Sequence, residues 1–447
     1  MPPVPGTTSR ATTTLPRQVR VLVLARCVNR LGGFSMAFLG VLFVRELGAG
    51  PAETALALTC FGVATIPSRM LGGHLADAWG HRRTMLLGLV GCAIAQLAVA
   101  GASSVGLAAA AATLLGLAYE VVEPPTQALV SDHVPEPARV FAYSVLNASL
   151  AVAGVLAGLL ATVVSPHGLR WLFVVDALTC LACAALVVRV VDPDHQGTRA
   201  TTTVPTTVST TVSTTVSTTV STTVSTTVST TVSTTVSTTG STTVPTGWSR
   251  WRAALGDRRL WPVVAFGTVV ATVTMVVVLG VPLLVEQRGW SPAVTGAVLA
   301  AAAAASVPGA WLAAAVRQRA DERRVLLVGE LAAAAGLVTI AAAHHPAVLA
   351  AGLVAFDVGG LLVLATTMAR AGTLAPEGAR GTYLALLGLT WGLATSVAPT
   401  LLALGSAPGP GIPFAVAGVA LAVSGGVRAA HTARAARPTA RFDPTLT

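Results

Sequence analysis

The sequence predicts an all-α polytopic membrane protein in which twelve transmembrane helices form two six-helix bundles. Of the 447 residues, 53% are hydrophobic and only 10% are charged, whereas a soluble domain carries about 25% charged residues. The hydrophobic residues fall into runs that are long enough to cross a bilayer, for which about 20 residues of helix are needed. A long polar segment separates six of these runs from the other six.

The runs can be assigned in chain order. Before the polar segment, the predicted helices cover residues 19–43, 54–77, 84–101, 104–127, 140–163 and 169–190. After it, they cover residues 260–285, 292–316, 325–343, 346–371, 381–405 and 411–428, of which the ninth and twelfth helices are short. Pro67, Pro308 and Pro399 lie inside these runs, and membrane helices tolerate proline because their neighbours satisfy the freed backbone groups.

The arginine distribution predicts the orientation in the membrane. All 28 basic residues are Arg. If the N-terminus is cytosolic, 22 of the 28 lie in cytosolic segments, and only Arg45, Arg170 and Arg288 face the outside. Cytosolic loops carry such an excess of positive charge. We therefore expect both termini to be cytosolic in a multi-pass protein of the cell (inner or plasma) membrane, and this arrangement requires an even number of helices.

The predicted domain organisation has five parts. They are a cytosolic N-tail (1–18), a six-helix bundle (19–191), a cytosolic linker (192–257), a second six-helix bundle (258–428) and a cytosolic C-tail (429–447). From Thr206 to Ser237 the linker repeats Thr-Thr-Val-Ser eight times. One Val in four residues cannot build a core, so we expect a disordered tether. A phosphorylation or docking segment is the alternative.

Other classes of function find little support in the sequence. The net charge of +10 is spread over short loops between apolar runs, which does not favour nucleic-acid binding. Cys180 and Cys183 have the spacing of a redox or metal pair, but all five cysteines fall in apolar runs and are interpreted as buried small side chains. With no nucleotide-binding loop, metal cluster or nucleophile constellation in the sequence, we expect no cofactor, no metal and no enzymatic activity.

The clearest motif follows the second predicted helix. It reads Gly72-Gly73-His74-Leu75-Ala76-Asp77-Ala78-Trp79-Gly80-His81-Arg82-Arg83. This segment resembles the signature loop of the major facilitator superfamily, Gly-x-x-x-Asp-Arg-x-Gly-Arg-Arg, with Ala78 and His81 at two of the arginine positions. The segments Tyr119–Pro124 and Ala375–Tyr383 are similar to a multidrug-efflux-like branch of that superfamily with twelve helices.

We interpret this loop as a gate. The predicted gating residues are Gly73, Asp77, Gly80, Arg82, Arg83 and Asp132. Gly73 and Gly80 allow close helix approach and a tight turn. Asp77 lies at a helix C-terminus, where the helix dipole disfavours an anion, so it needs compensation from an arginine or a neighbouring helix N-terminus. The resemblance implies that such a cluster latches one conformation. The alternative is a solvated orientation signal.

Ionisable residues inside the predicted helices form the second set of candidates. Each costs about 2.5–3.5 kcal/mol to insert and is functional by default. These residues are Arg30, Glu120, Asp176 and Asp357. The resemblance implies a central cavity lined by helices 1, 4, 7 and 10, which places Arg30, Glu120 and Asp357 beside the substrate path and Asp176 at the periphery. We expect Arg30 to hold Glu120 ionised in one state, although a static structural pair is the alternative.

The predicted function is secondary active transport by alternating access, namely proton-coupled export of small lipophilic or amphipathic molecules by a monomer in the lipid bilayer. A largely apolar cavity favours such substrates over sugars. The expected partners are the small-molecule substrate, protons and lipid, without nucleic acid. Two alternatives stay open, a metabolite importer or facilitator on the same fold and a transport-inactive membrane sensor or scaffold. The fourth predicted helix carries Glu120 and Glu123 where proton antiporters of the superfamily often have Arg.

The orientation can be tested by labelling single cysteines. In a cysteine-free background, Ser225→Cys in the linker and Thr447→Cys in the C-tail should both be protected from an impermeant thiol reagent in intact cells, because the arginine asymmetry predicts that both are cytosolic. Labelling should appear once the cells are permeabilised. If either position reacts from outside intact cells, the predicted topology is wrong.

Overall fold

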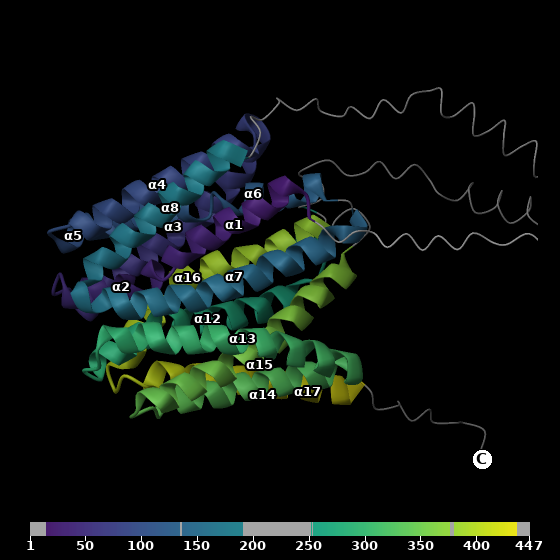
Figure 1. Ribbon diagram of the computed structural model, residues 1–447. Coiled ribbons are helices and arrows are strands. Elements are labelled where there is room, and N and C mark those ends of the chain that lie inside the picture. The colour runs from purple at the N-terminus through teal and green to yellow at the C-terminus, as the bar shows by residue number, and fades with distance from the viewer. Residues whose placement is uncertain (1–14, 135, 191–251, 253, 376–379, 436–447) are drawn as a thin grey trace, which may run out of the picture.

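The computed structural model describes residues 15–134, 136–190, 252, 254–375 and 380–435, and in this part of the chain all regular elements are helices. The helices run side by side along one common direction (Figure 1). We call the end at which Arg17 and Val190 lie the terminal end, on the right of Figure 1, and the opposite end the loop end.

The first half contains six membrane spans, two of which are interrupted. Its helices are α1 (Arg17–Gly32), α2 (Ser35–Arg45), α3 (Pro51–Trp79), α4 (His81–Gly101), α5 (Val105–Tyr119), α6 (Glu123–His133), α7 (Glu136–Val164) and α8 (Leu169–Val190), with a short 3-10 helix η1 (Ser165–His167) before α8. The first predicted helix is divided into α1 and α2, and the fourth into α5 and α6. Each pair still forms one candidate span.

The second half contains six uninterrupted helices. They are α12 (Trp261–Gln287), α13 (Pro292–Arg319), α14 (Glu322–Ala341), α15 (Pro346–Leu374), α16 (Arg380–Ser406) and α17 (Ile412–Ala435). Within the described residues, eleven stretches are long and apolar enough to cross a membrane, and the apolar stretch Ile412–Gly426 of α17 is shorter. The prediction of an all-α polytopic membrane protein is confirmed, and the helix order is consistent with twelve spans.

Most of the predicted linker lies outside the described residues, but its last residues are anchored on the second half. Ala254 is buried against Leu260 and Tyr383. The carboxylate of Asp257 accepts hydrogen bonds from the backbone N–H of Arg259 at 2.9 Å and from the Tyr383 hydroxyl at 2.8 Å. These two bonds lower the pKa of the Asp257 carboxyl. The chain that enters α12 is therefore fixed to the start of α16.

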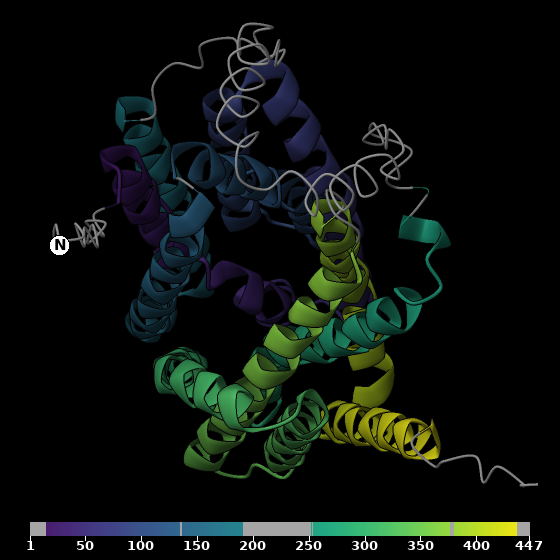
Figure 2. The same cartoon turned by 90° about the vertical axis from the view of Figure 1, so that its right-hand side faces the viewer.

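The two halves meet through pairs of helices that approach closely at small residues. The largest contacts join α3 to α16 and α7 to α13, and α2 also packs on α12. A Cβ atom at Gly158 of α7 would lie 2.6 Å from the backbone nitrogen of Ala300 in α13. A Cβ atom at Gly296 of α13 would lie about equally close to the backbone nitrogen of Thr162. Small residues let membrane helices pack backbone to backbone. Figure 2 shows the two halves from the terminal end, the first half above and the second below.

Cross-half contacts lie at the loop end and along α3 and α16. At the loop end, Arg45 of α2 forms an ion pair of 3.4 Å with Glu286 of α12. Along α3 and α16 the contacts run from the Thr59 and Thr400 hydroxyls, 3.5 Å apart, down to the Arg69 guanidinium lying against Gly388. These contacts hold the halves together on the loop-end side of Arg69.

Substituting one interface glycine should test this packing. Gly158→Ala should lower stability by about 1–3 kcal/mol, the usual cost of overpacking, because its Cβ would overlap the backbone of α13. Gly106→Ala in α5 is the control, since no atom lies within 4 Å of a Cβ at that position. Thermal unfolding followed by tryptophan fluorescence should rank Gly158→Ala below wild type and the control at or above it. Equal melting temperatures for the two variants would contradict the close packing.

Candidate functional site

The fourth membrane span is interrupted between α5 and α6, and two glutamates flank the interruption. Pro124 and Pro125 occupy the first turn of α6, where the missing N–H groups are tolerated but cannot continue the hydrogen-bond ladder of α5. Glu120 follows the last residue of α5, and Glu123 is the first residue of α6. The backbone N–H of Glu120 is satisfied by the hydroxyl of Ser68 at 3.0 Å. The interruption thus presents two carboxylates inside the membrane span.

Each of these glutamates forms an ion pair with an arginine from another helix. Arg69 of α3 places Nη1 3.5 Å from Oε2 of Glu120, and Arg26 of α1 places Nη2 2.7 Å from Oε2 of Glu123. The four side chains are partly buried, with exposed fractions between 16% and 35%. Partial burial strengthens the attraction between opposite charges, and removal of one partner would leave the other uncompensated.

The predicted pair of Arg30 with Glu120 is not formed in this conformation. Arg30 is exposed near the end of α1, and no carboxylate of the described residues forms an ion pair with it. The helix packing explains this outcome, because α5 packs on α3 and α4 whereas α1 packs on α6, α7 and α8. Arg69 is instead the partner of Glu120, and its guanidinium also lies against Gly388 of the second half.

Asp176 of α8 is buried, with 3% of its area exposed, in a cluster of uncharged polar groups. Its carboxylate accepts hydrogen bonds from the Ser35 hydroxyl of α2 and from the Gln96 amide of α4. The Thr179 hydroxyl lies 3.4 Å from the Asp176 carboxylate. The peripheral position expected for Asp176 stays a prediction, and no sequence pattern grouped this residue with Ser35 or Gln96.

A chain of polar contacts joins Asp176 to the first ion pair. The Cys180 thiol lies 3.8 Å from the Asp176 carboxylate, and the Asn29 amide donates to the Cys180 sulfur at 3.3 Å. Arg26, the partner of Glu123, donates to the side-chain amide oxygen of Asn29 at 3.2 Å. The partly exposed interruption of the fourth span is therefore connected to a carboxyl buried between α2, α4 and α8, of which α4 and α8 lie in the upper part of Figure 1.

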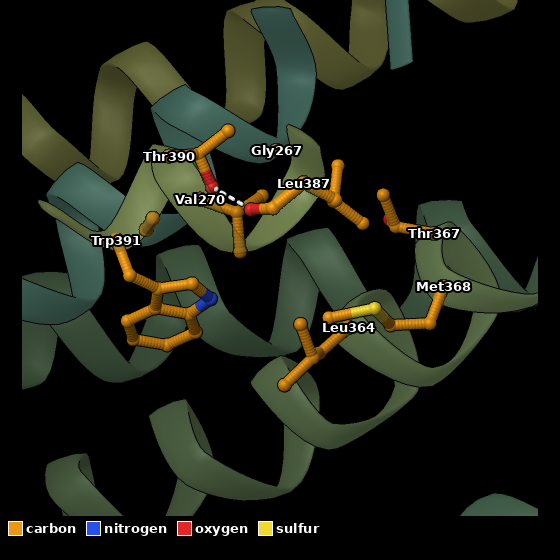
Figure 3. A pocket seen from close by; sticks show the side chains of 9 residues that line it. Gly267, Val270, Leu364, Thr367, Met368, Leu387, Thr390 and Trp391 are labelled. Carbon is orange, nitrogen blue, oxygen red and sulfur yellow. Dashed lines mark hydrogen bonds between the residues drawn. The ribbon is translucent and has the colours of Figure 1, made fainter. Parts of the chain in front are cut away.

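The second half contributes Asp357 and an apolar pocket. Asp357 of α15 is partly buried, and none of the described residues forms a hydrogen bond or ion pair with its carboxyl. The pocket is small, with a cavity volume of about 10 Å³, and is lined by Gly267, Val270 and Ala271 of α12, Leu364, Thr367 and Met368 of α15, and Leu387, Thr390 and Trp391 of α16. Figure 3 shows the Trp391 indole and the Leu364 and Met368 side chains facing the same space.

The pocket offers few polar groups. The hydroxyls of Thr367 and Thr390 donate to carbonyl oxygens of their own helices, at 2.7 and 2.6 Å. Asp357, Leu364 and Met368 follow the spacing i, i+7, i+11, which places them on one face of α15. Asp357 therefore lies about 10 Å from Leu364 along this face, on the side of the loop end. The predicted site residue and the pocket share one helix face.

The predicted gating loop is only partly assembled in this conformation. Gly80 makes the tight turn between α3 and α4 with φ of 89°, as expected. Asp77 is exposed, and it makes no hydrogen bond or ion pair with the described residues. Asp132 instead lies 3.3 Å from His81, and Arg82 donates to the Val188 carbonyl at the end of α8 at 2.7 Å. Arg83 follows in the first turn of α4.

Gly73 makes no close helix approach in this conformation. A Cβ atom at Gly73 would meet nothing within 4 Å, whereas at its neighbour Gly72 it would lie 2.7 Å from the Val121 carbonyl oxygen. Gly72 is thus the residue that lets α3 approach the interruption between α5 and α6. The sequence showed two adjacent glycines, and only the rotation of α3 decides which of them faces the neighbouring helix.

No group of three or more His, Cys, Asp and Glu side chains in the described residues is arranged to hold a metal ion. Cys180 and Cys183 are both free and buried. The functional groups of this part of the chain are carboxylates, arginines and neutral polar side chains inside an apolar bundle.

Comparison with known proteins identifies similar sequences. A profile of the Major Facilitator Superfamily matches residues 22–399 and 269–441. The puromycin resistance protein pur8 of Streptomyces alboniger is 29% identical over 160 residues, which are 35% of this chain and 31% of that protein. A Na(+), Li(+), K(+)/H(+) antiporter of Planococcus maritimus is 28% identical over 131 residues, which are 28% of this chain and 30% of that protein. These matches span about a third of the length of each relative.

Solved structures share the whole fold. A peptide transporter POT in complex with sulfate superposes with a TM-score of 0.70 at 16% identity, covering 94% of this chain and 95% of that one. A POT family transporter in complex with a thioalcohol conjugated peptide gives a TM-score of 0.72 at 13% identity, covering 94% and 97%. At these identities the likeness concerns the fold alone.

The exposed position of Asp77 leads to a prediction about conformational balance. Asp77→Asn should leave the conformation described here as stable as in wild type, because the carboxylate has no partner among its described residues. It should destabilise the opposite conformation, in which the cluster would form, by on the order of 1–3 kcal/mol. Spin labels at His133 and Thr373, both exposed at the terminal end, measure the distance between the two halves there. In the variant, a larger fraction of molecules should show the distance that belongs to the conformation described here.

The matched control for this measurement is Asp321→Asn, which neutralises another exposed carboxylate at the terminal end. It should leave the distance distribution unchanged. If Asp77→Asn also leaves both the distances and the turnover at wild-type values, the loop is only an orientation signal.

Proposed function

The chain belongs to the Major Facilitator Superfamily, a family of transporters, and from this premise we propose that it exports small lipophilic or amphipathic molecules in exchange for protons. The observation that carries the proposal is the carboxyl of Asp357, partly buried and without a partner among the described residues, on the helix face that also lines an apolar pocket. A carboxyl that can take up a proton and a binding surface for apolar groups thus share one face of α15, about 10 Å apart.

The pocket supports an apolar substrate. Its lining is mostly aliphatic and includes the flat indole of Trp391, and its two threonine hydroxyls already bond to their own helices. A sugar or a peptide would need several free donors and acceptors to replace its bonds to water, and the pocket does not supply them. The similarity to a puromycin resistance protein supports export of such a compound.

The carboxylates support coupling to protons. An ionised carboxyl in an apolar site is costly unless a positive charge compensates it, so Asp357 favours its neutral form when it is enclosed and releases the proton when water reaches it. Glu120 is compensated by Arg69, and Arg69 lies against Gly388 of the opposite half. Movement of the halves changes the surroundings of this arginine and thereby of its glutamate. The similarity to a cation/H(+) antiporter supports exchange.

The direction of opening follows from the cross-half contacts. We assign the terminal end to the cytosol because the arginines gather there. The cross-half contacts described above lie between the loop end and Arg69, and Asp77 at the terminal end is exposed. This conformation then corresponds to the state that receives substrate from the cytosol, and closure of the terminal end would assemble the gating loop. A rocking motion of this kind around a central site is the mechanism of many transporters with two repeated halves.

The coupling assignment can be tested with two conservative variants. Glu120→Gln and Asp357→Asn should abolish uptake of puromycin or ethidium into everted vesicles driven by a pH gradient, because the carboxyl that carries the proton is gone. Exchange of the same probe without a gradient should persist, since the apolar pocket is intact. Driven uptake and exchange are measured separately on the same vesicles, with the amount of folded protein determined in parallel.

The control is Asp321→Asn, an exposed carboxylate at the start of α14, which should transport like wild type. If both site variants keep full gradient-driven uptake, neither residue carries the proton. Uptake that needs no gradient in wild type would favour a facilitator. Binding without movement of any probe would favour a sensor or scaffold.

A further inference from the structure

A second feature of the first half takes no part in the proposed transport mechanism. The polar cluster around Asp176 lies between α2, α4 and α8, where the first span is interrupted. Asp176, Gln96 and Ser35 are buried, and Thr179 is partly buried. We propose that Asp176, Gln96, Ser35 and Thr179 form a binding site for a small monovalent cation of the Na⁺ or Li⁺ class. The proposal does not depend on the transported substrate or on the direction of transport.

The first argument is the composition of the cluster. All four side chains carry oxygen atoms, which are the ligands that hard cations prefer. Only one of them is a full anion, so the site matches a single positive charge better than a divalent ion. Among the described residues no basic side chain forms an ion pair with Asp176. Arg26, the arginine that the polar chain connects to Asp176, forms its ion pair with Glu123. A bound cation would supply the missing charge.

The second argument is an unsatisfied acceptor. Gln96 is 2% exposed. Its amide nitrogen donates to Asp176 and, at 3.1 Å, to the Ser35 hydroxyl, but the buried carbonyl oxygen of the same amide has no hydrogen-bond partner among the described residues. A buried acceptor without a partner costs about 1–3 kcal/mol. Rotation of the amide would turn this oxygen toward the carboxylate, where a cation between the two would satisfy both.

The third argument is the local backbone. Helix α1 ends at Gly32, and α2 begins at Ser35. The last carbonyl groups of a helix have no partner within it and can face a cation, as unwound backbone does in several transporters. A Cβ atom at Gly32 would overlap both Asp176 and the Thr179 hydroxyl. Glycine at this position therefore lets the end of α1 pack against the Asp176 carboxylate and the Thr179 hydroxyl.

The site can be tested by thermal unfolding of the purified full-length protein. Melting is followed by tryptophan fluorescence in NaCl, LiCl, KCl and choline chloride at one pH and one ionic strength. A ligand that binds only the folded protein raises the melting temperature in a saturable manner. We expect such a rise with Na⁺ or Li⁺ relative to choline, and we expect Asp176→Asn to remove it. Binding of radioactive sodium should reach one ion per chain.

Two milder variants keep the test decisive if Asp176→Asn folds poorly. Ser35→Ala and Gln96→Leu each remove one oxygen and should raise the half-saturating Na⁺ concentration by on the order of ten-fold. Ser306→Ala removes a partly buried hydroxyl of α13 that bonds only to its own helix, and it should titrate like wild type.

Three results would overturn the proposal. One is an equal melting temperature in all four salts. Another is a sodium response that survives unchanged in Asp176→Asn and Gln96→Leu. The third is a melting temperature that depends on pH and on Asp176 but on none of the cations, which would identify a proton site instead.

Discussion

The constraint on which the structure depends is that an ionisable group inside an apolar bundle must either be neutral or have its charge compensated by a partner. In the first half the two glutamates at the interruption of the fourth span are compensated by Arg69 and Arg26. Asp176, buried in the same half, is surrounded by neutral donors. In the second half Asp357 has neither kind of partner among the described residues. The carboxyl groups of the two halves thus have different surroundings, and the uncompensated one lies on the helix face that also lines the pocket.

Backbone geometry brings these groups together. Pro124 and Pro125 end the ladder of α5, and this interruption places Glu120 and Glu123 against different helices. Gly72 lets α3 approach the same point, and the small residues of α7 and α13 bring the halves into contact. Because Arg69 bonds within the first half and touches Gly388 in the second, the charge balance at Glu120 is tied to the relative position of the halves.

The sequence predicted the helices well because their signal is local. Hydrophobic run length alone located the spans, and even the short ninth helix proved to be a full candidate span, Glu322–Ala341. It could not predict partners between helices, because these depend on how each helix is rotated and on which helices are neighbours. Arg30 and Arg69 were both visible as arginines in membrane spans, but only the packing of α5 on α3 selects Arg69 as the partner of Glu120. Gln96, a single amide in an apolar run, was a signal that sequence reasoning overlooked.

The central claim is that Asp357 takes up and releases a proton inside the membrane. Infrared spectroscopy of the protein reconstituted in bilayers tests it directly, because a protonated carboxyl has a carbonyl stretching band that an ionised one lacks. On acidification, wild type and Asp321→Asn should gain a protonated-carboxyl band that Asp357→Asn does not gain. Identical spectra for wild type and Asp357→Asn at every pH would show that Asp357 does not change its protonation state, and this would contradict the account.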